Sequence, residues 1–190
     1  FIKGELPTDS FYEIFKGRYT EGFDVTKDLG RFGVVNQTTQ LASDTQEIAE
    51  YLKKLVMEHY QLDSSTINQR FADTRDTLCY ATNDNQTAVS GMLETTADLA
   101  IVVGGYNSSN TTHLVELCEK KIPTYFINNP DKLISPNEIQ HFDFHTKTEL
   151  VSTDYLPARR PVRVLITSGA SCPDAIVEDV IRKLAVFTDS

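Results

Sequence analysis

Residues 100–117 read AIVVGGYNSSNTTHLVEL, and a change of pattern inside them decides the fold. The apolar run from Ala100 to Val103 predicts a buried strand, which the glycine pair at 104–105 ends. Small uncharged polar residues fill positions 107–112, and apolar residues return at helical spacing from Leu114. The stretch therefore predicts a strand, a polar loop and a helix, in that order.

The same plan recurs nearer the start of the chain. Residues 32–35 predict a strand, and the sequence NQTT at 36–39 predicts a polar loop. Ser43 or Asp44 is the expected cap of the helix that follows.

Further units follow along the chain. A short strand is expected around residues 78–80, with a polar turn at 82–85 and then a helix. Residues 123–130 predict another strand. The last unit combines a strand at 162–166, a loop at 167–171 and an amphipathic helix.

Alternating strands and helices indicate the α/β class with parallel sheets. Residues 1–30 are rich in turn-forming residues and predict an irregular lead-in. We expect a partial α/β domain at 1–73, which includes this lead-in, and an α/β domain at 74–190. In such sheets ligands bind at the carboxyl ends of the strands, where all four polar loops are expected to lie.

Composition narrows the classes of ligand. The chain has 190 residues, 40% of them hydrophobic, and a formal net charge of −9. This balance argues against a nucleic-acid footprint and against attraction to an anionic membrane. No stretch approaches the roughly 18 consecutive apolar residues of a membrane span. Three cysteines at wide spacing do not form a disulfide framework and suit a reducing compartment.

The four polar loops offer a way to bind an anion without cationic side chains. A helix N-terminus leaves backbone N–H groups unpaired and carries about half a positive charge. Together with hydroxyl and amide side chains, the loops form a shell of neutral donors for a phosphate or diphosphate. The simpler interpretation is that these residues are only helix caps. Glycines in GGYN and SGAS permit positive φ and a close approach of ligand to backbone, but no GxGxxG or GK[ST] motif is present.

Each cysteine has a structural interpretation beside any functional one. Cys79 stands before a polar turn and is either a nucleophile or metal ligand, or a buried structural residue. Cys118 is expected in the core, because it lies four residues after Leu114. Cys172 either approaches the loops or fills space beside a helix start. No CxxC pair is present.

Four motifs, NQTT, DTLCYAT, GGYNSSNTTHL and TSGASCPD, resemble in their order and separation the LytB/IspH family of 4-hydroxy-3-methylbut-2-enyl diphosphate reductases. The resemblance covers nearly the whole chain, including the lead-in, which is similar to the longer insert of the plastid-type branch. It implies α/β domains in a pseudo-threefold trefoil around a [4Fe–4S] cluster held by three cysteines. It also implies reductive removal of the substrate's hydroxyl as water, which gives isopentenyl and dimethylallyl diphosphates.

The resemblance assigns roles to individual residues. Cys79 matches a cluster ligand, and Thr38 matches a catalytic threonine near the hydroxymethyl end of the substrate. Thr82 matches a threonine of the substrate loop beside the cluster. The predicted diphosphate clamp is Ser108, Ser109, Asn110 and Ser171, with Asn107 placed beside it among the substrate-binding residues.

The family's other two cluster cysteines have no counterpart here, so the chain is expected to be the C-terminal part of the enzyme, inactive alone. The resemblance implies a ferredoxin or flavodoxin as electron donor, and a compartment that is bacterial cytoplasm or a plastid-like organelle. Two alternatives remain at this stage: a non-redox three-cysteine [4Fe–4S] enzyme of the quinolinate synthase type, and a phosphosugar-binding domain.

Overall fold

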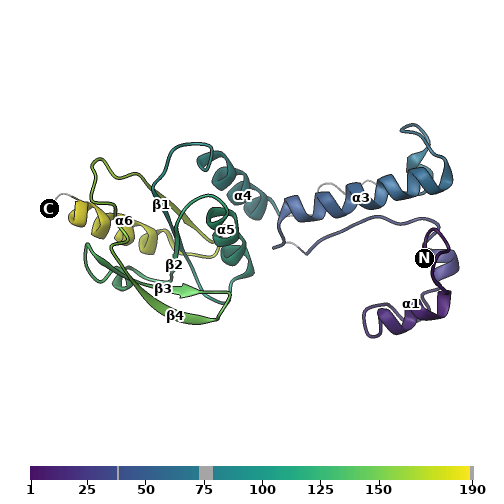
Figure 1. Ribbon diagram of the computed structural model, residues 1–190, viewed down its shortest axis with the longest axis horizontal. Helices are drawn as coiled ribbons and strands as arrows, with labels where there is room; N and C mark the ends of the chain where they lie inside the picture. The colour runs from purple at the N-terminus through teal and green to yellow at the C-terminus, as the bar shows by residue number, and fades with distance from the viewer. Residues whose placement is uncertain (38, 73–78, 189–190) are drawn as a thin grey trace. The chain divides into compact units, whose positions relative to one another are not determined.

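The computed structural model describes residues 1–37, 39–72 and 79–188 (Figure 1). The chain divides into two compact units. The helical unit comprises Phe1–Gln37 with Ala42–Thr77, and the sheet unit comprises Thr38–Leu41 with Leu78–Ser190. The predicted division between residues 73 and 74 stays a prediction.

The sheet unit is built on three parallel strands in the order β2-β1-β5, so the predicted α/β class is confirmed. In chain order its elements are α4 (Tyr80–Met92), β1 (Leu99–Val103), α5 (Ser109–Glu119), β2 (Thr124–Ile127), β3 (Glu138–Asp143), β4 (Thr148–Thr153), β5 (Val164–Ser168) and α6 (Asp174–Thr188), with a short 3₁₀ helix at Pro130–Lys132. The central strand β1 is buried along its whole length. The parallel pairing places the carboxyl ends of all three strands at one edge of the sheet.

Alternate residues of β1 serve two different cores. Ala100 and Val102 face a cluster that contains Val89 of α4 and Leu114 of α5. The opposite residues, among them Ile101, face a second cluster with residues of α6 and of the β3–β4 region. Helices α4 and α5 therefore cover one face of the sheet and α6 covers the other (Figure 1).

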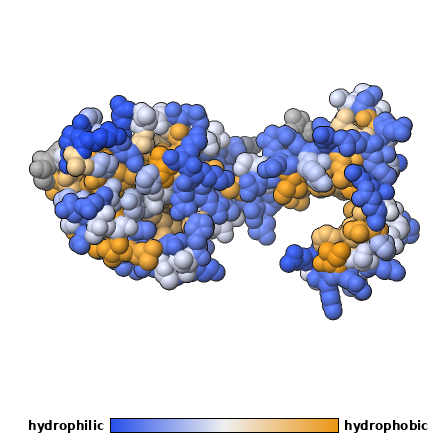
Figure 2. All heavy atoms as spheres, in the orientation of Figure 1, coloured by the Kyte–Doolittle hydropathy of each residue, from blue (hydrophilic) through white to orange (hydrophobic). Residues whose placement is uncertain are grey.

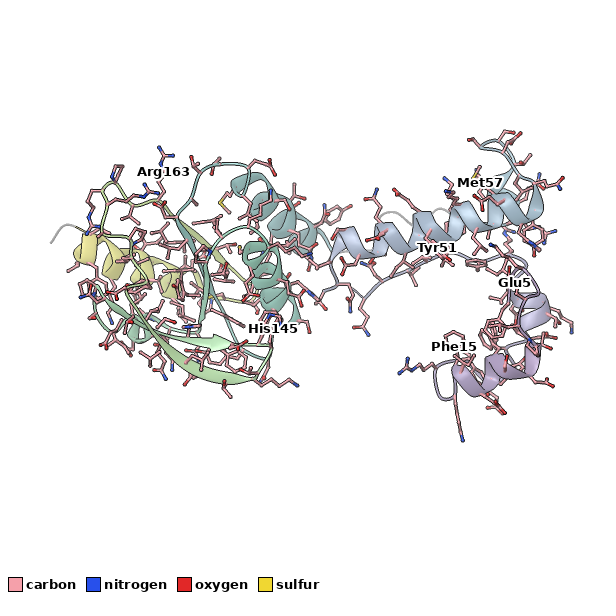
Figure 3. All side chains as sticks on the ribbon, viewed as in Figure 1. Glu5, Phe15, Tyr51, Met57, His145 and Arg163 are labelled. Atoms are coloured by element: carbon pink, nitrogen blue, oxygen red, sulfur yellow. The ribbon has the colours of Figure 1, made fainter. Side chains whose placement is uncertain are left out.

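An antiparallel hairpin of β3 and β4 packs beside β2 and was not predicted from the sequence. His141 is half-buried in β3, and its Nε2 lies 2.9 Å from the Ser152 hydroxyl. His145 lies exposed in the turn, with its Nε2 3.2 Å from a carboxylate oxygen of Glu119 at the end of α5 (Figure 3). Leu150 and Val151 of β4 are exposed.

The helical unit contains α1 (Thr8–Ile14), α2 (Val25–Asp28), α3 (Ala42–Tyr60) and a 3₁₀ turn at Ile67–Gln69. Its small core joins Val56 of α3 to Ile67 and Phe71. Around α1, the rings of Phe1, Phe11, Phe15, Tyr12, Tyr19 and Phe23 pack against one another (Figures 2 and 3).

Two predicted elements of the helical unit were wrong. The strand at 32–35 is a single bridge between Phe32 and Phe71, because no neighbouring strand in the described part of this unit extends the ladder. Helix α3 already begins at Ala42, so Ser43 and Asp44 lie inside it rather than capping it.

The elements expected around Cys79 were also wrong. Tyr80, expected at the end of a strand, begins α4, and the polar turn at 82–85 is part of that helix. Leu78 lies outside the described residues. These residues form a helix despite the weak helix propensity of Thr, Asn and Asp, because Thr82, Gln86 and Val89 fall on one buried face.

Within the described residues, no helix is both long enough and apolar enough to cross a membrane.

The burial of β1 predicts its contribution to stability. Ile101→Ala removes a fully buried side chain, and we expect the free energy of unfolding to fall by about 2–5 kcal/mol. The matched control is Ile181→Ala on α6, where the side chain is 48% exposed and a change of about 0.5 kcal/mol is expected. Urea denaturation measures both. Equal losses in the two variants would contradict the central role of β1.

Candidate functional site

The site begins where β1 and β5 end. The backbone N–H of Gly104 donates to the Ile127 carbonyl and that of Gly169 donates to the Val103 carbonyl, each at 3.0 Å. The two glycines therefore continue the hydrogen-bond ladder one residue past the strands. After them come the start of α5 and the loop that leads to α6.

Ser108 is the N-cap of α5, and its hydroxyl oxygen accepts a hydrogen bond from the Thr111 backbone N–H at 3.3 Å. The first turn of α5 contains no acidic residue, and neither does that of α4. By contrast, the first turns of α3 and α6 contain Asp44 and Asp174. The positive ends of α4 and α5 are thus left without a carboxylate to offset them.

Two residues in the first turn of α5 bury polar atoms without a partner. Asn110 is 7% exposed, and neither its Oδ1 nor its Nδ2 has a hydrogen-bond partner. Thr111 is fully buried, and its Oγ1 also lacks a partner. Such groups cost free energy in the folded state unless a ligand or another part of the protein satisfies them.

Thr111 also explains the glycines. A β-carbon added at Gly104 would lie 2.7 Å from the Thr111 Oγ1, and one added at Gly169 would overlap the same oxygen. Neither glycine is among those with positive φ. The expectation from sequence, that these glycines permit positive φ, was therefore wrong: they provide space for a side chain of α5.

The N-terminus of α4 lies at the same edge of the sheet. The Asn85 side-chain amide donates to the carbonyl of Ser168, the last residue of β5, at 3.3 Å. Cys79 is the N-cap residue of α4 and is exposed, and the Thr82 hydroxyl lies 3.0 Å from its sulfur. This contact, together with backbone N–H groups of the first turn, lowers the pKa of the Cys79 thiol.

All three cysteines are described, and none forms a disulfide. Cys118 is buried, as predicted, and burial raises its pKa to about 12. Cys172 is half-buried, and burial raises its pKa as well. Cys79 is therefore the cysteine whose thiolate forms most readily. In residues 1–37, 39–72 and 79–188, no group of three or more His, Cys, Asp and Glu side chains can hold a metal ion.

The segment that follows the predicted NQTT loop is tied to α4. The Gln86 side-chain amide donates to the Gln40 carbonyl at 2.9 Å, and Gln86 is 5% exposed. Leu41 beside it is 3% exposed. Thr38, the predicted catalytic residue, lies outside the described residues.

The other predicted residues are distributed between buried and exposed positions. Thr82 is buried, with its hydroxyl on the Cys79 sulfur. Asn107 and Ser109 are exposed at the start of α5, and Ser171 is exposed in the loop between β5 and α6. Their roles in binding stay predictions.

Sequence reasoning missed Gln86 as an anchor of residue 40, and Thr111 as the residue that fits against both glycines. For Thr111 the available signal was that a glycine directly follows both β1 and β5. For Gln86 the signal was its helical spacing from Thr82 and Val89, which the predicted turn obscured.

Together these features define the class: an α/β domain that presents uncharged donors and one exposed thiol at the carboxyl edge of its sheet. The model of a protein family described as LytB protein matches residues 9–185, and this chain belongs to that family. A 4-hydroxy-3-methylbut-2-enyl diphosphate reductase from Picosynechococcus sp. is 42% identical over 92% of this chain and 42% of its own length. One from Parasynechococcus marenigrum is 40% identical over 100% of this chain and 47% of its own length.

A solved structure of the E-1-hydroxy-2-methyl-but-2-enyl-4-diphosphate reductase from Plasmodium falciparum has the same fold. The TM-score is 0.53 at 21% identity, over 89% of this chain and 42% of that chain. The expected α/β domains of the trefoil type are thus confirmed for the part of the fold that this chain contains. The chain spans less than half the length of these relatives.

The environment of Cys79 predicts its reactivity. In iron-free protein near neutral pH, we expect iodoacetamide to alkylate Cys79 before Cys172 and Cys118, because Cys79 is exposed and its lowered pKa gives more thiolate. Thr82→Val removes the hydroxyl and shifts the pH–rate profile of Cys79 to higher pH. Peptide mapping by mass spectrometry follows each site. An unchanged profile in this variant would show that the Thr82 contact does not stabilise the thiolate.

Proposed function

We propose that this chain supplies the diphosphate-binding loops and one cluster thiolate of a 4-hydroxy-3-methylbut-2-enyl diphosphate reductase. The membership of the LytB family and the names of its cyanobacterial relatives support this activity over the two alternatives. The rest of the active site would come from the part of those relatives that this chain does not span.

The observation that carries the proposal is the buried, unpartnered side-chain amide of Asn110 at the start of α5. The Asn110 Nδ2 is a donor without an acceptor, next to a helix N-terminus without a carboxylate in its first turn. A diphosphate oxygen is a negatively charged acceptor, which suits both this donor and the positive end of the helix. Its binding would recover free energy that the folded chain alone loses.

Neutral donors suit a chain with a net charge of −9. Hydroxyl, amide and backbone N–H groups hold an anion at short range, where the acidity of the rest of the surface is screened by solvent and salt. The clamp residues Ser108, Ser109 and Ser171 would add their hydroxyls to the Asn110 amide. Asn107 and Thr82 complete the predicted substrate-binding set.

Cys79 fits the role of one cluster ligand. Its thiol is exposed, has a lowered pKa and is oriented by the Thr82 hydroxyl, as a thiolate ligand requires. A [4Fe–4S] cluster, when bound, supplies the electrons that remove the substrate's hydroxyl. The other two thiolates are expected from the part of the relatives that this chain does not span, because Cys118 is buried in the core and Cys172 is half-buried with a raised pKa.

The remaining roles follow from the same proposal. Gln86 would hold the backbone next to Thr38, so that the threonine hydroxyl lies near the hydroxymethyl end of the substrate. An electron donor of the ferredoxin or flavodoxin type would reduce the protein in a bacterial cytoplasm or a plastid-like compartment.

Replacing the thiol tests the activity. In the full-length protein, Cys79→Ser is expected to lower the iron content and to reduce turnover of 4-hydroxy-3-methylbut-2-enyl diphosphate by about 100-fold or more, because oxygen is a poor substitute for a thiolate ligand. The assay excludes oxygen and uses a reduced dye as electron source. Cys118→Ala is the matched control and keeps both iron and activity. Full activity and iron in Cys79→Ser would refute the proposal. A wild type that contains no iron and binds a sugar phosphate in preference to an allylic diphosphate would favour a phosphosugar-binding domain.

Replacing the buried amide tests the diphosphate site. Asn110→Ala is expected to weaken binding of inorganic diphosphate by about 10- to 150-fold, since a hydrogen bond to a charged group contributes roughly 1.5–3 kcal/mol. The melting temperature should not fall, because the lost amide has no partner in the chain. Calorimetry and thermal unfolding of the full-length protein measure the two effects. The control is Asn137→Ala, at an exposed position near β3.

The opposite result, a less stable variant with unchanged diphosphate affinity, would make Asn110 a structural residue and remove the main support for the site.

A further inference from the structure

The two loops that would bind the diphosphate come from different strands, and one side chain lies between their starting points. Thr111 is fully buried, and its Oγ1 lies against both Gly104 after β1 and Gly169 after β5. By contrast, a β-carbon added at Gly30 meets other residues, and one added at Gly91 or Gly105 meets nothing within 4 Å. The Thr111 side chain thus occupies space that a β-carbon at either glycine would need.

The backbone of Thr111 is fixed as well. Its N–H donates to the hydroxyl of Ser108, the residue that caps α5. Both glycines are held by ladder hydrogen bonds, Gly104 to the carbonyl of β2 and Gly169 to that of β1. A bulkier group in place of the Thr111 Oγ1 must therefore move α5, or the loop after β5, relative to the sheet.

We propose that Thr111 is a positioning residue that sets the spacing between Ser108 and Asn110 on one side of the diphosphate site and Ser171 on the other. The proposal rests on the proposed function, because that spacing matters only if both loops bind the same ligand. Thr111 itself touches no reacting atom. Its role is to fix how closely the start of α5 approaches the end of β5.

The chemistry of the side chain fits this role. An oxygen is smaller than a methyl group, so threonine allows the backbone of Gly169 to approach more closely than valine would. The hydroxyl has no hydrogen-bond partner, so it lowers stability rather than raising it. The Thr111 oxygen therefore acts through its small size and not through a hydrogen bond within the chain.

The test measures binding of inorganic diphosphate to the full-length protein by calorimetry, with thermal unfolding in parallel. Gly169→Ala is expected to weaken binding by about tenfold, because its β-carbon overlaps the Thr111 Oγ1 and pushes the loops apart. Gly91→Ala is the matched control, since an added β-carbon there meets nothing within 4 Å. Its affinity should equal that of wild type.

A second substitution tests the pair directly. Thr111→Ala removes the overlapping oxygen, so the double variant Gly169→Ala/Thr111→Ala should bind diphosphate more tightly than Gly169→Ala alone. If the double variant binds no better than the single one, the proposal is overturned. Should Gly169→Ala not fold, Thr111→Ser and Thr111→Val decide: serine keeps the oxygen and near-wild-type affinity, while valine weakens binding about fivefold.

Equal affinity of the serine and valine variants would also overturn the proposal. A folded Gly169→Ala with a lower melting temperature but wild-type affinity would do the same, because Thr111 would then be a packing residue only. Failure of the proposed function gives a different result: wild-type protein would not bind inorganic diphosphate at all.

Discussion

The parallel pairing of β1 on both sides is the constraint on which the rest of the sheet unit depends. Because β2 and β5 both run in the direction of β1, the segments that follow β1 and β5 leave the sheet at the same edge. The complete burial of β1 fixes this arrangement, since its alternate residues belong to two separate cores. Displacing the strand would open both cores at once. The site at the edge therefore adjoins the most completely buried strand of the sheet.

At that edge the folded chain contains groups that lower its stability. Asn110 and Thr111 bury polar atoms that the described chain does not satisfy, and the N-termini of α4 and α5 lack acidic residues in the first turn. A domain optimised only for stability would place an aspartate or a ligand-independent partner there. Unsatisfied polar groups concentrated at one sheet edge are what a binding site for an anion requires before its ligand arrives.

Helix α4 shows why part of the site escaped prediction. The sequence ATNDN has the composition of a turn, and Asn and Asp favour turns in isolation. In the structure this segment is helical, because Thr82 and Gln86 lie on the buried face of α4. The helix brings Cys79 to the edge of the sheet through the contact of Asn85 with Ser168. Cys79 is thus the N-cap of a helix and not the end of a strand, and its place beside the diphosphate loops stays a prediction.

The sequence by itself determined the α/β class, the strands at β1, β2 and β5, the polar composition of the loops after β1 and β5, and the family resemblance, because these depend on local periodicity and on motifs of adjacent residues. It did not determine the β3–β4 hairpin, the single bridge at Phe32 or the helical start at Tyr80, each of which depends on which distant surface covers the segment. Only the tertiary structure showed that the glycines after β1 and β5 make room for Thr111. The physical reason is that a steric fit between residues 104, 111 and 169 exists only after the sheet has brought the two strand ends together.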